Sequence, residues 1–105
     1  MTDYIVVLVT ASSEEEGEKI AQALVEEKLA ACVNVLPAMK SIYRWKGEIA
    51  SEKEVLLLAK TKDRLFERLK RRVLEIHSYE VPEIIALPVL AGFEPYLGWA
   101  SKETL

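Results

Sequence analysis

The chain alternates twice between short apolar runs rich in β-branched residues and segments whose apolar residues recur with helical spacing. The run at residues 4–10 precedes one such segment, and the run at residues 54–61 precedes the other. Short apolar runs favour buried strands, whereas spacings of three and four residues favour amphipathic helices. The pattern therefore predicts a strand–helix–strand order that occurs twice, with the first strand buried on both faces.

The predicted helices have recognisable starts. Ser13 and Glu16 have the spacing of a capping box, in which a hydroxyl and a carboxylate satisfy free backbone N–H groups, and the first helix is predicted over residues 14–29. Asp63 is predicted to cap the second helix. That helix ends before Pro82, because the residue preceding a proline is disfavoured in the α region. Its apolar face comprises Leu65, Phe66, Leu69, Val73 and Ile76, and its basic face comprises Arg64, Arg68, Lys70, Arg71 and Arg72.

The segment between the two units reads as a long hairpin over residues 30–61. Strands are predicted at residues 30–36 and 41–45, with Pro37 at a bulge and Gly47 in a turn that needs a positive φ. Each arm is predicted to exceed about 10 residues, against a usual strand length of about 5–6. An apolar hairpin that overhangs a small sheet favours association with another copy of the chain.

The order of elements predicts an α+β fold, a ferredoxin-like βαββαβ sandwich with helices on one face of an antiparallel sheet. A last core strand is expected at residues 83–87 and a short C-terminal helix at residues 92–103. With 105 residues, the chain has room for one domain, and residues 1–105 are assigned to it.

Composition excludes several classes of function. The formal net charge is −3, which disfavours a general nucleic-acid binder. The single cysteine cannot form a disulfide framework and fits a reducing compartment, so a cytoplasmic location is expected. The apolar run at residues 5–9 is far shorter than the roughly 20 residues that cross a bilayer, so no membrane partner is expected. The common hydrolase, zinc-protease and nucleotide-binding motifs are absent from the sequence.

A few residues are candidates for binding chemistry. His77 is the only histidine and lies near Glu83; it is either a cap at a helix end or a ligand for copper or zinc. Cys32 is either a buried thiol or a soft-metal ligand. Lys60 closes an apolar strand and either extends to solvent or binds an anion. Arg44, between two aromatic residues, suits an oligomer interface or a grip on a carboxylate or phosphate.

Several segments together resemble the CutA divalent-cation-tolerance family. They are Ala-Ala-Cys-Val-Asn at 30–34, Ser-Ile-Tyr-Arg-Trp-Lys-Gly at 41–47, Leu-Ala-Lys-Thr at 58–61, His-Ser-Tyr-Glu-Val-Pro-Glu at 77–83 and Tyr-Leu-Gly-Trp at 96–99. The resemblance covers nearly the whole chain. It implies a ferredoxin-like fold, a tight PII-like homotrimer and a link to tolerance of copper and other divalent cations.

The resemblance also implies a site. Some bacterial members carry a cysteine where this chain has Val9, and two adjacent histidines where it has Ile76 and His77. The implied metal ligands are therefore His77, with Glu83 and Cys32 as helpers, for Cu or another divalent cation such as Zn, with no organic cofactor. The implied cleft between subunits is lined by Lys60, Tyr79, Trp45 and Arg44.

The leading interpretation is a cytoplasmic, trimeric, metal-responsive binding protein that performs no covalent chemistry. A PII-like sensor of a small anionic metabolite or nucleotide is the second, motivated by Lys60 and Arg44. A trimeric interaction scaffold is a third. An enzyme with His77 as acid–base and Glu83 as its partner ranks last, because no motif specifies a substrate.

Overall fold

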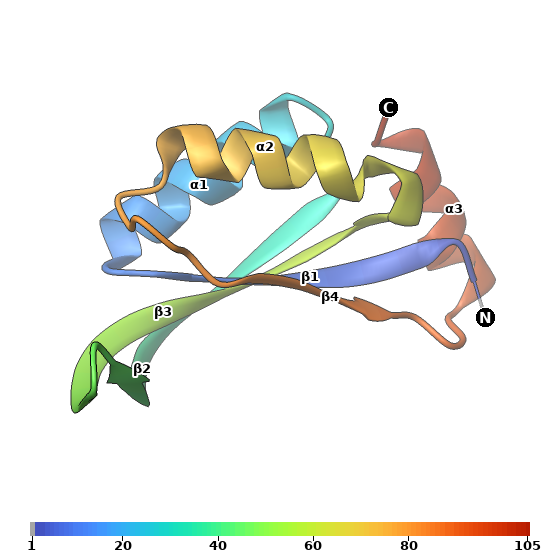
Figure 1. Cartoon of the computed structure of the whole chain (residues 1–105). Helices are drawn as coiled ribbons and strands as arrows, with labels where there is room; N and C mark the ends of the chain where they lie inside the picture. The colour runs from blue at the N-terminus through green and yellow to red at the C-terminus, as the bar shows by residue number, and fades with distance from the viewer. Residues whose placement is uncertain (1) are drawn as a thin grey trace.

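The computed structural model describes residues 2–105, which form one four-stranded sheet with helices packed against it. The strands lie in the order β2-β3-β1-β4, and each neighbouring pair is antiparallel. Helices α1 and α2 lie side by side over one face, and α3 lies at the end of the sheet that carries both termini (Figure 1). The elements are β1 (Tyr4–Ala11), α1 (Glu14–Glu26), β2 (Cys32–Trp45), β3 (Glu48–Lys62), the 3₁₀ turn η1 (Asp63–Leu65), α2 (Phe66–Ile76), β4 (Ile84–Pro88) and α3 (Glu94–Lys102). The predicted ferredoxin-like α+β sandwich is confirmed.

The core lies between the sheet and the two long helices. Val7 and Val9 of β1 and Leu57 of β3 pack there against Leu24 of α1 and Leu69 of α2, all without exposed surface. Along β1, buried residues alternate with half-buried ones from Tyr4 to Val9. The expectation that this strand is buried on both faces is therefore wrong for the single chain, because helices cover only one face of the sheet.

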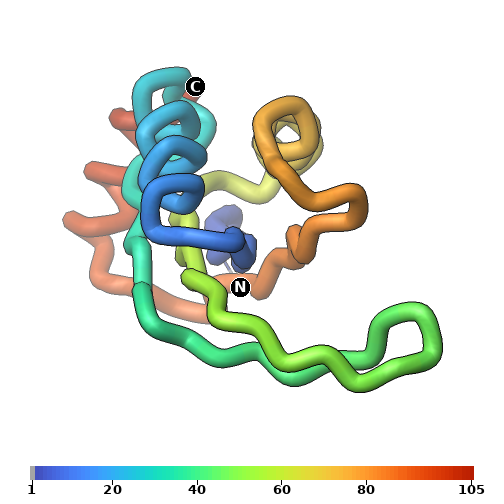
Figure 2. Tube along the Cα trace, turned by 90° about the vertical axis from the view of Figure 1, so that its left-hand side faces the viewer, coloured from blue at the N-terminus to red at the C-terminus, as the bar shows by residue number. Residues whose placement is uncertain are grey.

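The hairpin of β2 and β3 has arms of 14 and 15 residues, which confirms the prediction that each arm exceeds about 10 residues. Its register shifts between Leu36 and Met39, so the bulge expected at Pro37 is present. At the tip, Lys46 and Gly47 both adopt positive φ, the conformation of the tight turn that matches strand twist. Figure 2 shows the green hairpin passing below the orange segment that follows α2.

Two predicted helix ends are wrong. α1 stops at Glu26 rather than at residue 29, because Lys28 adopts a left-handed φ of 59° and the Leu29 N–H donates to the Leu24 carbonyl. Asp63 does not cap a helix through its side chain; it begins η1, and α2 starts at Phe66. Both ends depend on backbone turns that a stripe of apolar residues does not record.

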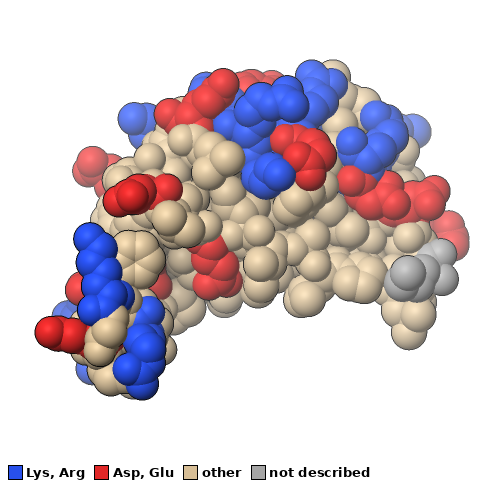
Figure 3. All heavy atoms as spheres, viewed as in Figure 1, with Lys and Arg blue, Asp and Glu red and all other residues tan. Residues whose placement is uncertain are grey.

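The outer surface of α2 carries the predicted basic face. Lys and Arg side chains gather over α2, with acidic side chains among them (Figure 3). The basic residue Arg72 forms ion pairs with Glu27 and Glu75. This pairing favours a solvated surface held by ion pairs over a free anion site. Within residues 2–105, no helix has both the length and the apolar character needed to cross a bilayer.

Candidate functional site

The start of α1 is held by a serine and a glutamate. The Ser13 hydroxyl accepts the Glu16 N–H at 3.1 Å, which confirms one half of the predicted capping box. The return bond differs, because Glu16 Oε1 accepts the N–H of Ser12 at 3.0 Å and its hydroxyl at 2.8 Å, instead of the N–H of Ser13. Because Oε1 alone binds Ser12, the second carboxylate oxygen of Glu16, Oε2, is available to a more distant partner.

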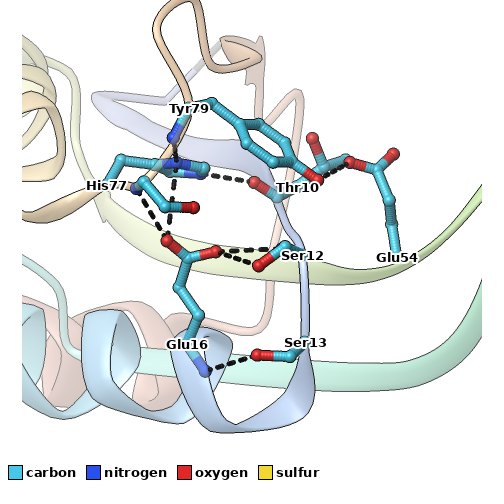
Figure 4. A network of polar contacts seen from close by, with 8 residues as sticks. Thr10, Ser12, Ser13, Glu16, Glu54, His77 and Tyr79 are labelled. Atoms are coloured by element: carbon cyan, nitrogen blue, oxygen red, sulfur yellow. Dashed lines mark hydrogen bonds and ion pairs between the residues drawn. The ribbon is translucent and has the colours of Figure 1, made fainter.

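That partner is the segment that follows α2. Glu16 Oε2 accepts the backbone N–H of Ser78 at 2.7 Å (Figure 4). Burial raises the pKa of Glu16, but the hydrogen bonds donated by Ser12 and Ser78 outweigh it and lower the pKa to about 2. One ionised carboxylate therefore joins the first turn of α1 to a segment 62 residues later in the chain.

His77 sits beside this carboxylate with its side chain fully buried. Its Nε2 lies 2.7 Å from the Thr10 carbonyl, which can only accept, so Nε2 carries the proton. Its Nδ1 accepts the Tyr79 N–H at 3.0 Å and lies 3.7 Å from Glu16 Oε2. His77 is the C-cap residue of α2, where its backbone N–H donates to the Val73 carbonyl. Both ring nitrogens are used by other backbone groups, so the ring itself links α2 to β1.

Tyr79 extends the network onto the hairpin. Its hydroxyl donates to Glu54 Oε2 at 2.6 Å, and its ring lies 4.7 Å from the ring of His77. Burial and the neighbouring Glu54 carboxylate raise the pKa of Tyr79 well above its usual value. The segment after α2 is therefore fixed to α1, β1 and β3 by Ser78, His77 and Tyr79 in turn (Figure 4).

A cavity of about 750 Å³ lies between this segment and the hairpin. Three of its lining residues are carboxylates, three are aromatic, and none is Lys or Arg. The lining residues are Thr10, Ser41, Ile42, Tyr43, Trp45, Glu54, Ser78, Tyr79, Glu80, Val81 and Glu83. Of the predicted cleft residues, Tyr79 and Trp45 lie here, whereas Lys60 and Arg44 are not part of the lining. An anionic ligand has no basic partner among these side chains.

Cys32 and Lys60 lie together elsewhere on the sheet. They are register partners in β2 and β3, with Lys60 Nζ 4.0 Å from Cys32 Sγ and hydrogen-bonded to the Asn34 side chain. The sheet register separates them from His77, whose partner Thr10 pairs with Leu56, four residues along β3 from Lys60. Lys60 is thus occupied by Asn34 and not presented to the cavity.

The predicted metal ligands are not assembled within one chain. Residues 2–105 contain no group of three His, Cys, Asp or Glu side chains close enough to hold one metal ion. Glu83 is exposed and lines the cavity, whereas the buried His77 side chain does not line it. Cys32 is the first residue of β2, at the opposite end of that strand from the residues that line the cavity. The carboxylate beside His77 is Glu16, not Glu83.

Sequence reasoning missed the roles of Glu16, Ser12, Ser78 and Glu54 at this site. The sequence did contain a signal for Glu16, because its place in a capping box puts a carboxylate at the start of the first helix. No signal existed for Ser78, because a backbone N–H carries no side-chain information.

Comparison with known proteins gives a consistent result. Residues 5–103 match the family described as CutA1 divalent ion tolerance protein. The chain is 54% identical over 99 residues to the divalent-cation tolerance protein CutA of Thermus thermophilus, covering 94% of this chain and 96% of that protein. It is 47% identical over 100 residues to the chloroplastic protein CutA of Arabidopsis thaliana, covering 95% of this chain but 55% of that protein.

A solved structure agrees with this result. The solved structure of the divalent cation tolerance protein of Thermus thermophilus superposes with a TM-score of 0.94 at 52% identity, over 96% of this chain and 98% of that one. Sequence and fold therefore agree over almost the full length of the bacterial relative. The chain belongs to the CutA1 divalent ion tolerance protein family.

Proposed function

We propose that this protein acts in divalent-cation tolerance by binding a divalent ion, with copper as the first candidate and zinc as the second. The observation that carries the proposal is the match over 96% of a bacterial relative named for divalent-cation tolerance. The proposal assigns a binding role and no covalent chemistry. It is supported by His77, the acid–base candidate, whose two ring nitrogens are both engaged by backbone groups.

The proposed ion site is completed between chains. A site within one chain does not fit, because residues 2–105 bring no three suitable ligands together. His77 would have to release the Tyr79 N–H before its Nδ1 lone pair could reach a metal. Glu83 is exposed, and Cys32 is a free, partly exposed thiol, so a second copy of the chain can supply what one copy lacks.

The proposed assembly is a homotrimer, and the apolar surface supports self-association. At the hairpin tip Ile42 is 71% exposed, and on the edge strand β4 Ile85 is 50% exposed. Ile49, Trp45 and Leu87 add to these two surfaces. Exposed apolar strands at a sheet edge favour association with another chain. We also propose a cytoplasmic location, which suits the free thiol of Cys32.

The test is calorimetric titration of Cu(II) and Zn(II) into metal-free protein at neutral pH. We expect saturable binding that weakens at least tenfold in Cys32→Ser or Glu83→Gln and is unchanged in Glu14→Gln, an exposed carboxylate on α1. These variants are preferred to His77→Ala, which removes two hydrogen bonds from the fold. If neither ion gives heat or raises the melting temperature, the metal-binding part of the proposal is wrong.

The assembly is tested separately by sedimentation equilibrium. We expect the mass of three chains for the wild type and a smaller mass for Ile42→Lys, because a charge would be buried at the contact. A monomeric wild type would contradict the trimer. A trimer that binds neither ion would instead favour the scaffold interpretation, in which assembly itself is the function.

A further inference from the structure

The cavity between the hairpin and the segment after α2 contains an incompletely paired carboxylate. Glu54 is only 8% exposed and lines the cavity. Its Oε2 accepts the Tyr79 hydroxyl, whereas its Oε1 has neither a hydrogen bond nor an ion pair within residues 2–105. Figure 4 shows this second oxygen turned away from Tyr79. Within residues 2–105, every side-chain oxygen or nitrogen that is shielded from solvent has a hydrogen-bond partner, so this unpaired oxygen is open to the cavity, where an incoming cation can reach it.

The remaining walls add both charge and aromatic surface. Glu80 and Glu83 are exposed at the cavity and make no ion pair within residues 2–105. Tyr43 and Trp45 present ring surface from the hairpin. Aromatic faces attract organic cations, and a carboxylate beside them fixes the charged end. The cavity therefore combines an apolar wall with negative charge.

This combination selects among classes of ligand. An anion is disfavoured, because the lining contains three glutamates and no Lys or Arg. A bare metal ion is disfavoured, because no three of the described carboxylates, histidine or cysteine converge on one point. The volume of about 750 Å³ is also far larger than one ion needs and is in the range of small-molecule sites.

We propose that this cavity binds an organic cation, an ammonium or guanidinium group on an apolar stem, with Glu54 as the buried counter-charge and Trp45 and Tyr43 as the aromatic wall. The group can belong to a free amine or to a basic side chain of a second copy of the chain. Glu83 lies at both this cavity and the proposed divalent-ion site, but Glu54, Tyr43 and Trp45 belong to the cavity alone, so the Glu54 and Trp45 variants test the cation site independently of the ion site.

The experiment is calorimetric titration of spermidine into the full chain at about 0.15 M salt, where attraction to distant charges is screened beyond about 8 Å. 1,8-Octanediol serves as an uncharged probe of similar length. Glu54→Gln removes the charge but keeps an oxygen for the Tyr79 hydroxyl, and Trp45→Ala removes half-exposed ring surface. Glu15→Gln, on the exposed first turn of α1, makes the same change in net charge away from the cavity.

We expect spermidine to bind while octanediol does not. Glu54→Gln should weaken binding at least tenfold, Trp45→Ala about two- to fivefold, and Glu15→Gln not at all. Equal weakening by Glu54→Gln and Glu15→Gln, or equal binding of the diol, would overturn the proposal. If spermidine does not bind, the assembly masses of Glu54→Gln and wild type are compared by sedimentation equilibrium. A smaller mass for Glu54→Gln indicates that the cation is a basic side chain of a second copy of the chain. An unchanged mass overturns the proposal. Melting curves establish that each variant is folded.

Discussion

Glu16 and Ser78, which are 62 residues apart in the sequence, are joined by a 2.7 Å hydrogen bond from the first turn of α1 to the segment that follows α2. The same carboxylate accepts hydrogen bonds from Ser12, so one side chain connects the segment before α1 to the segment after α2. This contact positions His77 and Tyr79, and the Tyr79 side chain lines the cavity. The geometry of the candidate site therefore depends on a residue that does not line it.

Glu16→Gln is expected to destabilise the fold by about 1.5–3 kcal/mol, because hydrogen bonds to a charged acceptor are replaced by weaker ones to a neutral amide. The free energy of unfolding from urea titration is the measurement. Glu15→Gln is the matched control, since Glu15 is exposed in the same turn. Equal stability of the two variants would show that the contact with Ser78 contributes nothing.

The stabilisation by Glu16 is expected to depend on pH. Its pKa is about 2 in the folded chain against an ordinary 4.5, so its contribution is complete above about pH 4.5 and is lost as the pH falls toward 2. The difference in unfolding free energy between wild type and Glu16→Gln should therefore narrow between about pH 5 and pH 2. A difference that stays constant over this range would contradict the low pKa. Other carboxylates affect both proteins equally and cancel.

His77→Ala is expected to destabilise metal-free protein by roughly 2–4 kcal/mol, because the Thr10 carbonyl and the Tyr79 N–H both lose their partner. The measurement is urea unfolding in the presence of a chelator, so that any metal contribution is removed. Glu80→Ala, an exposed change in the same segment, should alter stability by less than about 0.5 kcal/mol. A destabilisation of His77→Ala seen only with metal present would mean that the ring has no structural role.

Two glycines are expected to respond to alanine with opposite signs. In α1, a Cβ at Gly17 would lie 2.8 Å from Val55 Cγ2, so the helix must move away from β3 at a cost of about 1–3 kcal/mol. In α3, a Cβ at Gly98 meets nothing within 4 Å, and alanine should stabilise the helix by up to about 1 kcal/mol. Thermal melts of Gly17→Ala and Gly98→Ala compare them directly. Stabilisation of Gly17→Ala would show that α1 does not pack this closely.

Features encoded within a few residues were predictable from the sequence. Gly47 in its turn, Pro37 at its bulge and Ser13 at its helix start follow from local backbone chemistry. Asp63 misled, because an acceptor before an apolar stripe equally suits a 3₁₀ turn. No sequence pattern indicated that the turn after helix α1 would place Lys28 in a left-handed conformation.

The candidate site was harder to predict because its contacts join distant segments. Tyr79 and Trp45, expected at a cleft between subunits, line the cavity of the single chain, whereas Lys60 pairs with Asn34 on another part of the sheet. The sequence pattern placed Glu54 only at the start of a predicted apolar strand and indicated no role for it. Its partner Tyr79 lies 25 residues later, and no local pattern connects the two. The anion-sensor interpretation rests on Lys60 and Arg44, and neither residue lines this cavity.

The bulge after Leu36 also limits how other chains can add to the sheet. β2 is an edge strand, and its pairing with β3 is continuous over residues 32–36 and again over residues 39–45. Pro37 has no N–H to offer, and Ala38 has a positive φ that turns the backbone out of line. An incoming strand therefore meets two short ladders instead of one long one. The interruption protects a fourteen-residue edge from open-ended, fibre-like stacking while leaving each half available for a closed, specific contact.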